Sequence, residues 1–390
     1  GLSSCHVGRF VFWNFADVND HKKFPSVPVE KGEDTFTFSE GPSTPDSSIF
    51  WMPDSIRLNG ERFHLEELLE RNKTVAFLVI RNDTLFYEKY FAKREAGSVH
   101  PSFSVAKSFV SALVGIAIEE GHIGGVGDPM VQYLPGLDEE EFGDITLEHL
   151  RNMRSGLAFN EGYFNPFGDV AKYYYGRHLR KYIQGIERER PSGERFRYIS
   201  LNTQLLGIIV ENATGRSLAD YLEEKIWRPL GMEYDASWSM DKKKDGQIKA
   251  FCCLNARARD FAKLGRLYLN GGRWGGRQIV PEEWVRRSTT YEEPLNGFRY
   301  KYHWWHRAKY QWVSDSLEVP EVHLRDTNRE GREYISSHAG PFIAEGILGQ
   351  YVYVHPEKKM IIVRLGKNYG KKKELKGAWE SLFDFVCRIN

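Results

Sequence analysis

A run of ten residues without a charged side chain, 109–118, constrains the fold of this chain most strongly. A helix that is apolar on nearly every side has to be buried in the core of a protein. Glu119, Glu120 and Gly121 follow the run, and a glycine is a common residue just beyond the end of a helix. We therefore expect a central helix, buried on most sides, around which the rest of the chain packs.

Ser104 and Lys107 stand immediately before this apolar run. A serine and a lysine three residues apart on a helix share one face, so their side chains can meet. Burial disfavours the charged form of a lysine, and a neutral lysine can take the proton of a serine and make it a nucleophile. The alternative is an ordinary N-cap serine at the positive end of the helix dipole, followed by a lysine that reaches solvent.

A second Ser-x-x-Lys pattern, Ser239 to Lys242, shows how weak the motif is by itself. It runs into Lys243, Lys244, Asp245 and Gly246, a sequence typical of a solvated turn. No apolar helix follows that could bury the lysine. Only the first copy therefore predicts a catalytic pair.

The charge balance excludes several classes of partner. The 390 residues contain 54 Lys and Arg against 53 Asp and Glu, a net charge of +1, so nothing indicates nucleic acid or an anionic membrane.

His303 and His306 have a spacing seen in metal sites, but no acidic ligand lies nearby in the sequence, and we predict no metal. The chain has no glycine-rich phosphate loop, and we predict no cofactor.

The four cysteines do not form a disulfide framework for a chain of this length: Cys5, Cys252, Cys253 and Cys387. The adjacent pair lies in an apolar context and is expected in the core. Leu2-Ser3-Ser4-Cys5 resembles the end of a bacterial lipoprotein signal, in which the cysteine is lipidated. We therefore expect an exported lipoprotein, periplasmic or membrane-anchored through Cys5, with a chance match as the alternative.

Hydrophobic periodicity and turn residues divide the chain into three parts. Residues 1–60 predict an extended N-terminal arm, residues 61–103 and 296–390 a sheet domain, and residues 104–295 a mainly helical insertion with the serine at its junction. Residues 156–197 are irregular and aromatic, as in a pocket wall. A hairpin is expected at 74–80 and 84–91, helices at 63–72, 130–134, 146–153, 202–212, 217–227, 256–270, from 281 and at 374–388, and strands at 300–305, 334–337, 347–355 and 360–365.

Further motifs follow Ser104 and Lys107 in a characteristic order. They are Tyr198-Ile199-Ser200 before a helix that ends in Ala213-Thr214-Gly215, the segment 256–265, and the segment 271–284. From about residue 60 onward the chain resembles the serine β-lactamase and penicillin-binding-protein superfamily, most of all its class C-like esterases and nylon-oligomer (aminohexanoate-dimer) hydrolases. The resemblance implies an α/β (α+β) fold of the β-lactamase/transpeptidase type. Its antiparallel sheet comes from both termini, is flanked by helices, and carries an inserted mainly helical region.

The resemblance also implies roles for individual residues. Ser104 is the expected nucleophile, and Lys107 and Tyr198 are expected to move protons, which requires a cation beside the phenol. Ser200 is expected as a polar group behind them. Asn202 is expected as a helix cap or as a further hydrogen-bond partner at the substrate site.

The family's third motif, Lys-Thr-Gly or a variant, aligns with Ala344-Glu345-Gly346. The backbone N–H groups of Ser104 and Ile347 would then form the oxyanion hole. Ala344 stands where β-lactamases carry a cation for the drug's carboxylate, which makes efficient β-lactam turnover less expected. His338-Ala339-Gly340 is a competing match.

Three aromatic residues complete the expected substrate site. Tyr163, in Asn160-Glu161-Gly162-Tyr163, resembles a tyrosine of the nylon-oligomer hydrolases that hydrogen-bonds the substrate amide. Trp304 and Trp305 match an aromatic strand near the pocket, and at most one of them should line it because strand side chains alternate.

The sequence thus predicts a serine hydrolase, an esterase or amidase that acts on a small ester or amide through an acyl-enzyme on Ser104. One alternative is a D-alanyl peptidase or β-lactamase acting on cell-wall-like amides. Another is a non-catalytic envelope lipoprotein that keeps the fold as a binding module.

Overall fold

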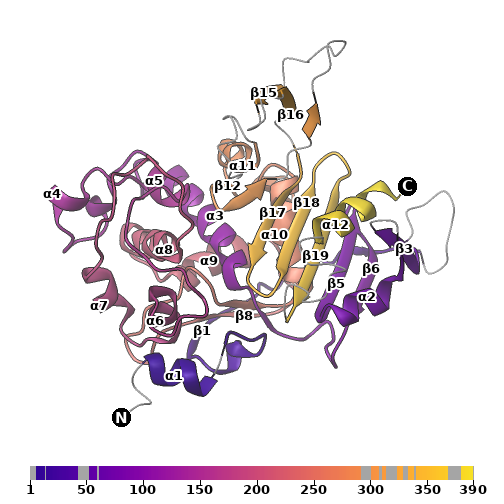
Figure 1. The fold of residues 1–390 in the computed structure, drawn as a ribbon, viewed down its shortest axis with the longest axis horizontal. Helices are drawn as coiled ribbons and strands as arrows, with labels where there is room; N and C mark the ends of the chain where they lie inside the picture. The colour runs from indigo at the N-terminus through magenta and orange to yellow at the C-terminus, as the bar shows by residue number, and fades with distance from the viewer. Residues whose placement is uncertain are drawn as a thin grey trace.

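The computed structural model describes residues 6–13, 15–42, 52–58, 61–290, 300–306, 310–312, 323–327, 333–337, 340–367 and 379–389. A mixed sheet with helices on both faces lies beside a lobe of helices (Figure 1). No helix in these ranges is long and apolar enough to span a bilayer. The lipid anchor expected at Cys5 concerns a residue outside the described ranges.

The main sheet has eight strands in the order β12-β13-β17-β18-β19-β5-β6-β2. Strands from near both ends of the chain meet at its centre, where β19 pairs with β5. The expectation of one sheet built from both termini is confirmed. The pairing is not purely antiparallel, because the edge strand β2 runs parallel to β6. The bounds are β2 Ser39–Glu40, β5 Thr74–Arg81, β6 Thr84–Tyr90, β12 Tyr300–Lys301, β13 Trp304–His306, β17 Phe342–Gly346, β18 Gln350–His355 and β19 Met360–Gly366.

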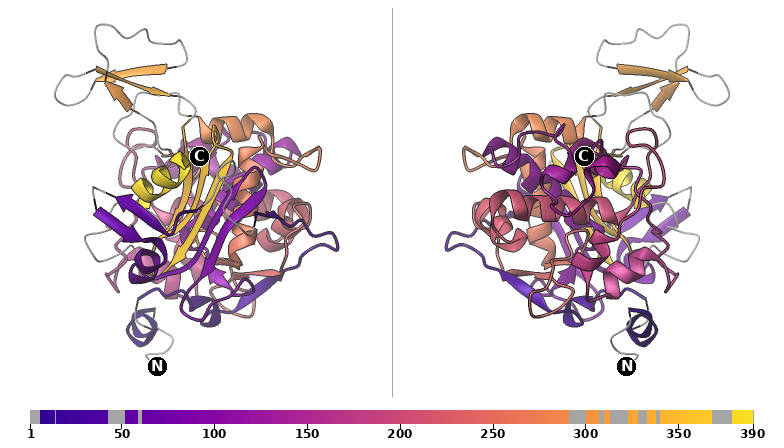
Figure 2. Two further views of the ribbon diagram at one scale, coloured as in Figure 1. Left: turned by 90° about the vertical axis from the view of Figure 1, so that its right-hand side faces the viewer. Right: turned by 90° about the vertical axis from the view of Figure 1, so that its left-hand side faces the viewer.

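Each face of the sheet packs on its own apolar core. Helices α2 (Leu65–Arg71) and α12 (Trp379–Arg388) cover one face, and α10 (Ala258–Leu269) covers the other (Figures 1 and 2). Gly265 permits the close approach of α10, since a Cβ there would lie 3.0 Å from Ile361 Cγ2. The period-2 pattern of the strands explains the two cores, because successive side chains point to opposite faces.

Helix α3 (Ala106–Glu119) connects the sheet with the helical lobe. Its residues from Ala106 to Ala117 are all buried, as the uncharged run predicts. It packs against α8 (Ser200–Thr214), which ends at Gly215 in the left-handed conformation. The other helices of this region are α4 Glu139–Phe142, α5 Leu147–Arg151, α6 Asp169–Tyr175, α7 Leu179–Gln184, α9 Leu218–Leu222 with a π-helical extension Glu223–Trp227, and α11 Glu282–Thr289.

The N-terminal arm is not simply extended. Its first described residues form helix α1 (His6–Trp13), which packs against α6. Its strand β1 (Ser26–Val29) joins a second sheet in the order β1-β8-β9-β7. Residues 15–42 therefore attach the arm to the second sheet through β1 and to the main sheet through β2. The partners of β1 are β8 Ala236–Ser239, β9 Leu254–Ala256 and β7 His100–Pro101.

Some expected elements differ in detail. The segment 156–197 contains α6 and α7 and is not irregular throughout. The strand expected at 300–305 is broken by a turn at Tyr302 and His303, which both have positive φ. The strand expected from 347 begins at Gln350, because residues 347–349 form a turn. The remaining described strands are β3 Ser55–Leu58, β4 Glu61–His64, β10 Arg273–Trp274, β11 Arg277–Gln278, β14 Tyr310–Trp312, β15 His323–Thr327 and β16 Glu333–Ser337.

Candidate active site

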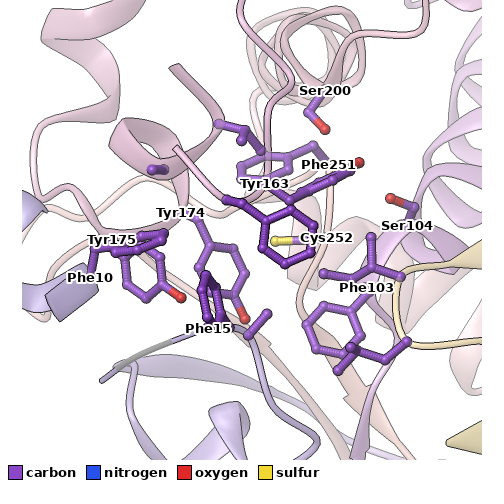
Figure 3. Close-up of a pocket in the computed structure, with 16 residues that line it drawn as sticks. Phe10, Phe15, Phe103, Ser104, Tyr163, Tyr174, Tyr175, Ser200, Phe251 and Cys252 are labelled. Atoms are coloured by element: carbon purple, nitrogen blue, oxygen red, sulfur yellow. The ribbon is translucent and has the colours of Figure 1, made fainter. Parts of the chain in front are cut away.

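Ser104 lies in a short 3₁₀ turn, Phe103–Val105, which leads directly into α3. It is not the N-cap of the helix, as the alternative interpretation had it, because Val105 occupies that position. Phe103 has a φ of 44°, an uncommon conformation for a residue with a side chain. The turn presents Ser104 half-buried at one end of a pocket, while its neighbours Phe103 and Val105 are buried (Figure 3).

Lys107 is buried and points back toward Ser104. Its ammonium nitrogen Nζ donates hydrogen bonds to Ser104 Oγ at 3.0 Å, to Ser200 Oγ at 3.3 Å and to the carbonyl of Phe251 at 2.8 Å. The three partners come from the 3₁₀ turn before α3, from the first residue of α8 and from the segment just before β9. The expected Ser104–Lys107 contact is thus present, and the lysine is held in one place.

The burial of Lys107 lowers its pKa from 10.5 to about 8, and the nearby carboxylate of Glu161 opposes this shift. Part of the Lys107 population is therefore neutral near pH 7 and can act as a base. Its neutral form has a lone pair that can accept the proton of Ser104. The alternative of a lysine that reaches solvent is wrong, since Lys107 is only 1% exposed.

The second Ser-x-x-Lys pattern has no comparable arrangement. Ser239 is buried on β8, where Asn255 Nδ2 donates to its Oγ at 3.1 Å. Lys243 and Lys244 in the following turn are exposed, as expected. The pattern therefore belongs to a strand end and a surface turn.

Glu161 is a member of the site that the sequence interpretation did not assign. Its carboxylate accepts hydrogen bonds from Ser200 Oγ at 2.6 Å, from Ser200 N at 2.7 Å and from Tyr163 OH at 2.8 Å. It thereby ties the loop that follows Asn160 to the first turn of α8. The position of Glu161 in the motif Asn160 to Tyr163 could have indicated its role, but only the tyrosine of that motif was assigned to the site.

Tyr198 lies beside Lys107, with the lysine Nζ 5.2 Å from the centroid of its ring. The ring stacks on Trp305 at a centroid distance of 5.8 Å and an interplanar angle of 22°. The structure thus places the aromatic ring of Tyr198 next to the Lys107 ammonium. Its part in proton transfer stays a prediction.

Trp304 does not belong to the site. It is fully buried and packs against Tyr268 and Phe342 at centroid distances of 4.6 and 5.2 Å. Successive side chains of β13 point in opposite directions, so Trp305 reaches Tyr198 while Trp304 enters the core. Trp305 supports Tyr198 from behind and is not among the residues that line the pocket.

Asn202 is a structural residue and not a substrate contact. It is fully buried in α8, and Ser155 Oγ donates to its Oδ1 at 2.7 Å. Its Nδ2 faces Met153 Sδ at 3.6 Å. It is also not a helix cap, because α8 already begins at Ser200 with Ile199 as the N-cap.

Strand β17 brings the third motif to the serine. A Cβ on Gly346 would lie only 2.7 Å from the carbonyl oxygen of Ser102 and 3.2 Å from Phe103 Cβ, so only glycine fits there. Ile347 follows and lines the pocket together with Ser104. The backbone role of Ile347 in an oxyanion hole stays a prediction. Ala344 is buried on the same strand. Residues 338 and 339 of the competing match lie outside the described ranges.

Tyr163 lines the pocket as expected, from the loop that also supplies Glu161. Cys252 lines it as well (Figure 3). Cys252 and Cys253 are buried, as expected, but a disulfide joins them, which was not. The pair directly follows Phe251, whose carbonyl binds Lys107.

His303 is a core residue. Its Nε2 lies 2.8 Å from Thr203 Oγ1, and burial keeps its pKa well below the ordinary range. No cluster of three or more metal-ligating side chains occurs within the described ranges. The pair His303 and His306 therefore has no third ligand there.

Comparison with known proteins identifies the family. A sequence model of the family described as Beta-lactamase matches residues 64–384. The chain belongs to the beta-lactamase family. Ser104, Lys107 and Tyr198 all lie within the matched region.

Two curated proteins show partial similarity to this chain. The 6-aminohexanoate-dimer hydrolase of Paenarthrobacter ureafaciens is 29% identical over 232 residues, which cover 57% of this chain and 58% of the hydrolase. Penicillin-binding protein 4* of Bacillus subtilis (strain 168) is 29% identical over 189 residues, 44% of this chain and 41% of that protein. The aligned part is thus under two thirds of either relative.

Solved structures confirm the fold over almost the whole chain. A candidate 6-aminohexanoate-dimer hydrolase from Bacillus anthracis matches with a TM-score of 0.73 at 23% identity, over 97% of this chain and 94% of that one. A class C beta-lactamase matches with a TM-score of 0.58 at 15% identity, over 84% and 94%. The expected β-lactamase/transpeptidase-like fold is therefore correct.

Proposed function

We propose that this member of the beta-lactamase family is a serine amidase or esterase that acts through an acyl-enzyme on Ser104. The observation that carries the proposal is the 3.0 Å contact between Ser104 Oγ and the buried Nζ of Lys107. A nucleophile and its base within hydrogen-bond reach, with the base held by a third group, form the general arrangement for covalent catalysis. The carbonyl of Phe251 and Ser200 Oγ hold the base here.

Proton transfer begins at the neutral form of Lys107. It accepts the proton of Ser104 as Oγ attacks the substrate carbonyl, and the bond to the leaving group then breaks. Tyr198, beside the resulting ammonium, donates its proton to the leaving nitrogen or oxygen and regains one from Lys107. A water molecule attacks the acyl-enzyme by the same path and releases the acid.

The negative charge on the carbonyl oxygen needs hydrogen-bond donors. The backbone N–H groups of Ser104 and Ile347 are the proposed donors. The close approach of Gly346 to Ser102 supports this, because it brings β17 beside the turn that carries the nucleophile.

The pocket favours a neutral amide or ester over a β-lactam or a D-alanyl peptide. Those substrates end in a carboxylate, and Ala344 supplies no cation to hold it. Among the described residues that line the pocket, none is charged. The name of the Paenarthrobacter relative, 6-aminohexanoate-dimer hydrolase, supports cleavage of an amide bond.

A non-catalytic binding module is the alternative from another class. A binding module does not require a lysine next to a serine with a pKa that is lowered by burial. The exported, lipid-anchored location expected from Cys5 stays a proposal.

Covalent trapping tests the function. The protein is treated with an alkyl fluorophosphonate, and the modified peptide is located by mass spectrometry. We expect a single adduct on Ser104 that a nitrophenyl ester substrate protects against. A parallel panel of nitrophenyl butyrate, a chromogenic cephalosporin, 6-aminohexanoate dimer and a D-Ala-D-Ala peptide ranks the substrate classes.

Ser239→Ala is the matched control, because it alters the serine of the other Ser-x-x-Lys pattern and should label normally. The Ser104→Ala protein should neither label nor turn over substrate. Absence of Ser104-dependent labelling and of turnover for every substrate would contradict the hydrolase proposal.

The pH dependence of kcat/KM should report Lys107. Activity is expected to rise with pH through about 8, where the lysine loses its proton and becomes a base. The carboxylate of Glu161 raises the pKa of Lys107, so Glu161→Gln removes a charge that favours the ammonium. The acidic limb of the profile should therefore move to lower pH in this variant.

Glu194→Gln provides the control, since this exposed carboxylate lies on the segment that leads to Tyr198. Its profile should match that of the wild type. A shift of the Glu161→Gln limb toward higher pH, or no shift, would contradict the electrostatic role given to Glu161.

A further inference from the structure

The pocket beside Ser104 is apolar and strongly aromatic (Figure 3). Its aromatic wall comes from segments far apart in the sequence, and six of its members are Phe10, Phe15, Tyr163, Phe164, Tyr174 and Phe251. Ser104 and Ser200 contribute hydroxyl groups to the lining, and so do the tyrosines (Figure 3). Such a lining lowers the free energy of an apolar group and penalises a charged one.

The position of the pocket indicates which part of a substrate it holds, the acyl group or the leaving group. A leaving group has to lie beside the side chain that protonates it, which is Tyr198 in the proposed function. Tyr198 does not line the pocket, whereas Ser104 and Ile347 do. The pocket is therefore on the side of the acyl group, which stays bonded to Ser104 until water releases it.

The N-terminal arm forms part of this wall. Phe10 on α1 packs edge-on against Tyr175 at a centroid distance of 5.3 Å, and Trp13 packs against Phe24 at 5.4 Å. Phe15 follows the helix and meets Phe164 edge-on at 5.2 Å. Aromatic contacts thus hold the arm in place, and its residues Phe10 and Phe15 line the pocket together with Phe164.

The surface around the mouth is unusually apolar. Within the described ranges, the large hydrophobic side chains that are exposed all lie at residues 11–15 and 163–167. Phe164 is 79% exposed and Phe15 is 46% exposed, although both line the pocket. Exposed apolar groups gathered at a pocket mark a ligand site more often than they occur by chance.

We infer that the pocket is the acyl subsite, and that it selects an uncharged, apolar acyl chain of medium length, which the arm and the 163–167 loop cover. The inference rests on the proposed function, because it assumes that Ser104 accepts the acyl group. A 6-aminohexanoate dimer, named in the Paenarthrobacter relative, fits this lining less well: its acyl part ends in an ammonium, which the described lining residues would desolvate without a charged partner.

A series of nitrophenyl esters tests the subsite. The acyl chain is lengthened from acetyl through butyryl and hexanoyl to octanoyl, each below its critical micelle concentration. We expect kcat/KM to rise by about threefold per methylene, on the order of 100-fold from acetyl to hexanoyl. The 6-aminohexanoyl ester should be at least ~10-fold poorer than the hexanoyl ester.

Phe164→Asp places a charge at the mouth without altering the buried core. The ratio of octanoyl to acetyl kcat/KM should fall about tenfold in this variant. Phe12→Asp is the matched control: Phe12 is 84% exposed on α1 but does not line the pocket, so the ratio should stay at the wild-type value.

Binding to Ser104→Ala separates the inference from the function. Calorimetric titration with acetamide, hexanamide and octanamide should show affinity that rises with chain length. If esters are hydrolysed but neither rate nor binding depends on chain length, the subsite is wrong and the hydrolase stands. If no ester is hydrolysed while binding depends on chain length, the function is wrong and the apolar subsite stands.

Discussion

Replacing Lys107 by methionine is expected to reduce kcat/KM by about 10³-fold, because the only base in contact with Ser104 Oγ among the described residues is lost. Methionine has nearly the same length and shape, so the buried site stays filled. Steady-state kinetics with a nitrophenyl ester measures the effect. The Ser104→Ala protein gives the baseline.

The stability of the same variant shows whether the loss is chemical. With a folded-state pKa of about 8 against 10.5 when unfolded, Lys107 opposes folding by about 3 kcal/mol at pH 7. Methionine removes this penalty but also three hydrogen bonds of about 1 kcal/mol each. The two effects nearly cancel, so the melting temperature should change by only a few degrees.

The sign of the pH effect gives a second check. At Lys107 the unfolded chain binds more protons than the folded one between pH 8 and 10.5, so this lysine contributes a gain in stability across this window as pH rises. Lys107→Met should lack that gain. Lys242→Met, in the other Ser-x-x-Lys pattern, should keep both the gain and full activity. Activity of Lys107→Met within tenfold of the wild type would contradict its role as the base.

The parts of the site that sequence alone predicted are those that depend on local pattern. The uncharged run after Lys107 forced a buried helix, and a buried helix desolvates whatever lysine begins it. Tyr198 and Gly346 came from motifs that occur in a fixed order. The structure contains these features because each depends on residues that lie close together in the sequence.

The parts that sequence did not predict depend on distant contacts. Glu161 meets Ser200 across a separation of 39 residues, and no periodicity indicates which carboxylate of an irregular loop turns inward. Asn202 appeared to cap a helix, but Ser155 satisfies it inside the core. Strand alternation could exclude one of two tryptophans without indicating which, since a turn at Tyr302 and His303 sets the phase of β13.

The helix at residues 6–13 was not predicted either, because it also depends on contacts with residues that are distant in the sequence. Residues 6–13 have too few turns to form a stable helix in isolation, and α1 depends on its packing against α6. Tertiary contact therefore decides the conformation of the segment that reaches the acyl pocket. This explains why a resemblance beginning near residue 60 contained no information about Phe10 or Phe15.

Gly346→Ala is expected to lower kcat by about 10²-fold, although it adds a single methyl group outside the catalytic set. The new Cβ would lie 2.7 Å from the carbonyl oxygen of Ser102, a backbone atom that cannot rotate away. Strand β17 and the turn that carries Ser104 would have to separate, which shifts the serine relative to the proposed donor at Ile347. A displacement of about 1 Å is enough for a loss of this size.

Stability should fall by about 1–3 kcal/mol in the same variant, since the methyl group overpacks a buried contact. Gly97→Ala is the matched control: a Cβ there has no neighbour within 4 Å, so activity and melting temperature should both be retained. Measuring kcat, KM and thermal unfolding for both variants separates the two effects. A Gly346→Ala protein that loses stability but keeps its kcat would show that the close approach of β17 supports the fold alone, and the oxyanion donor would then have to be sought away from this strand.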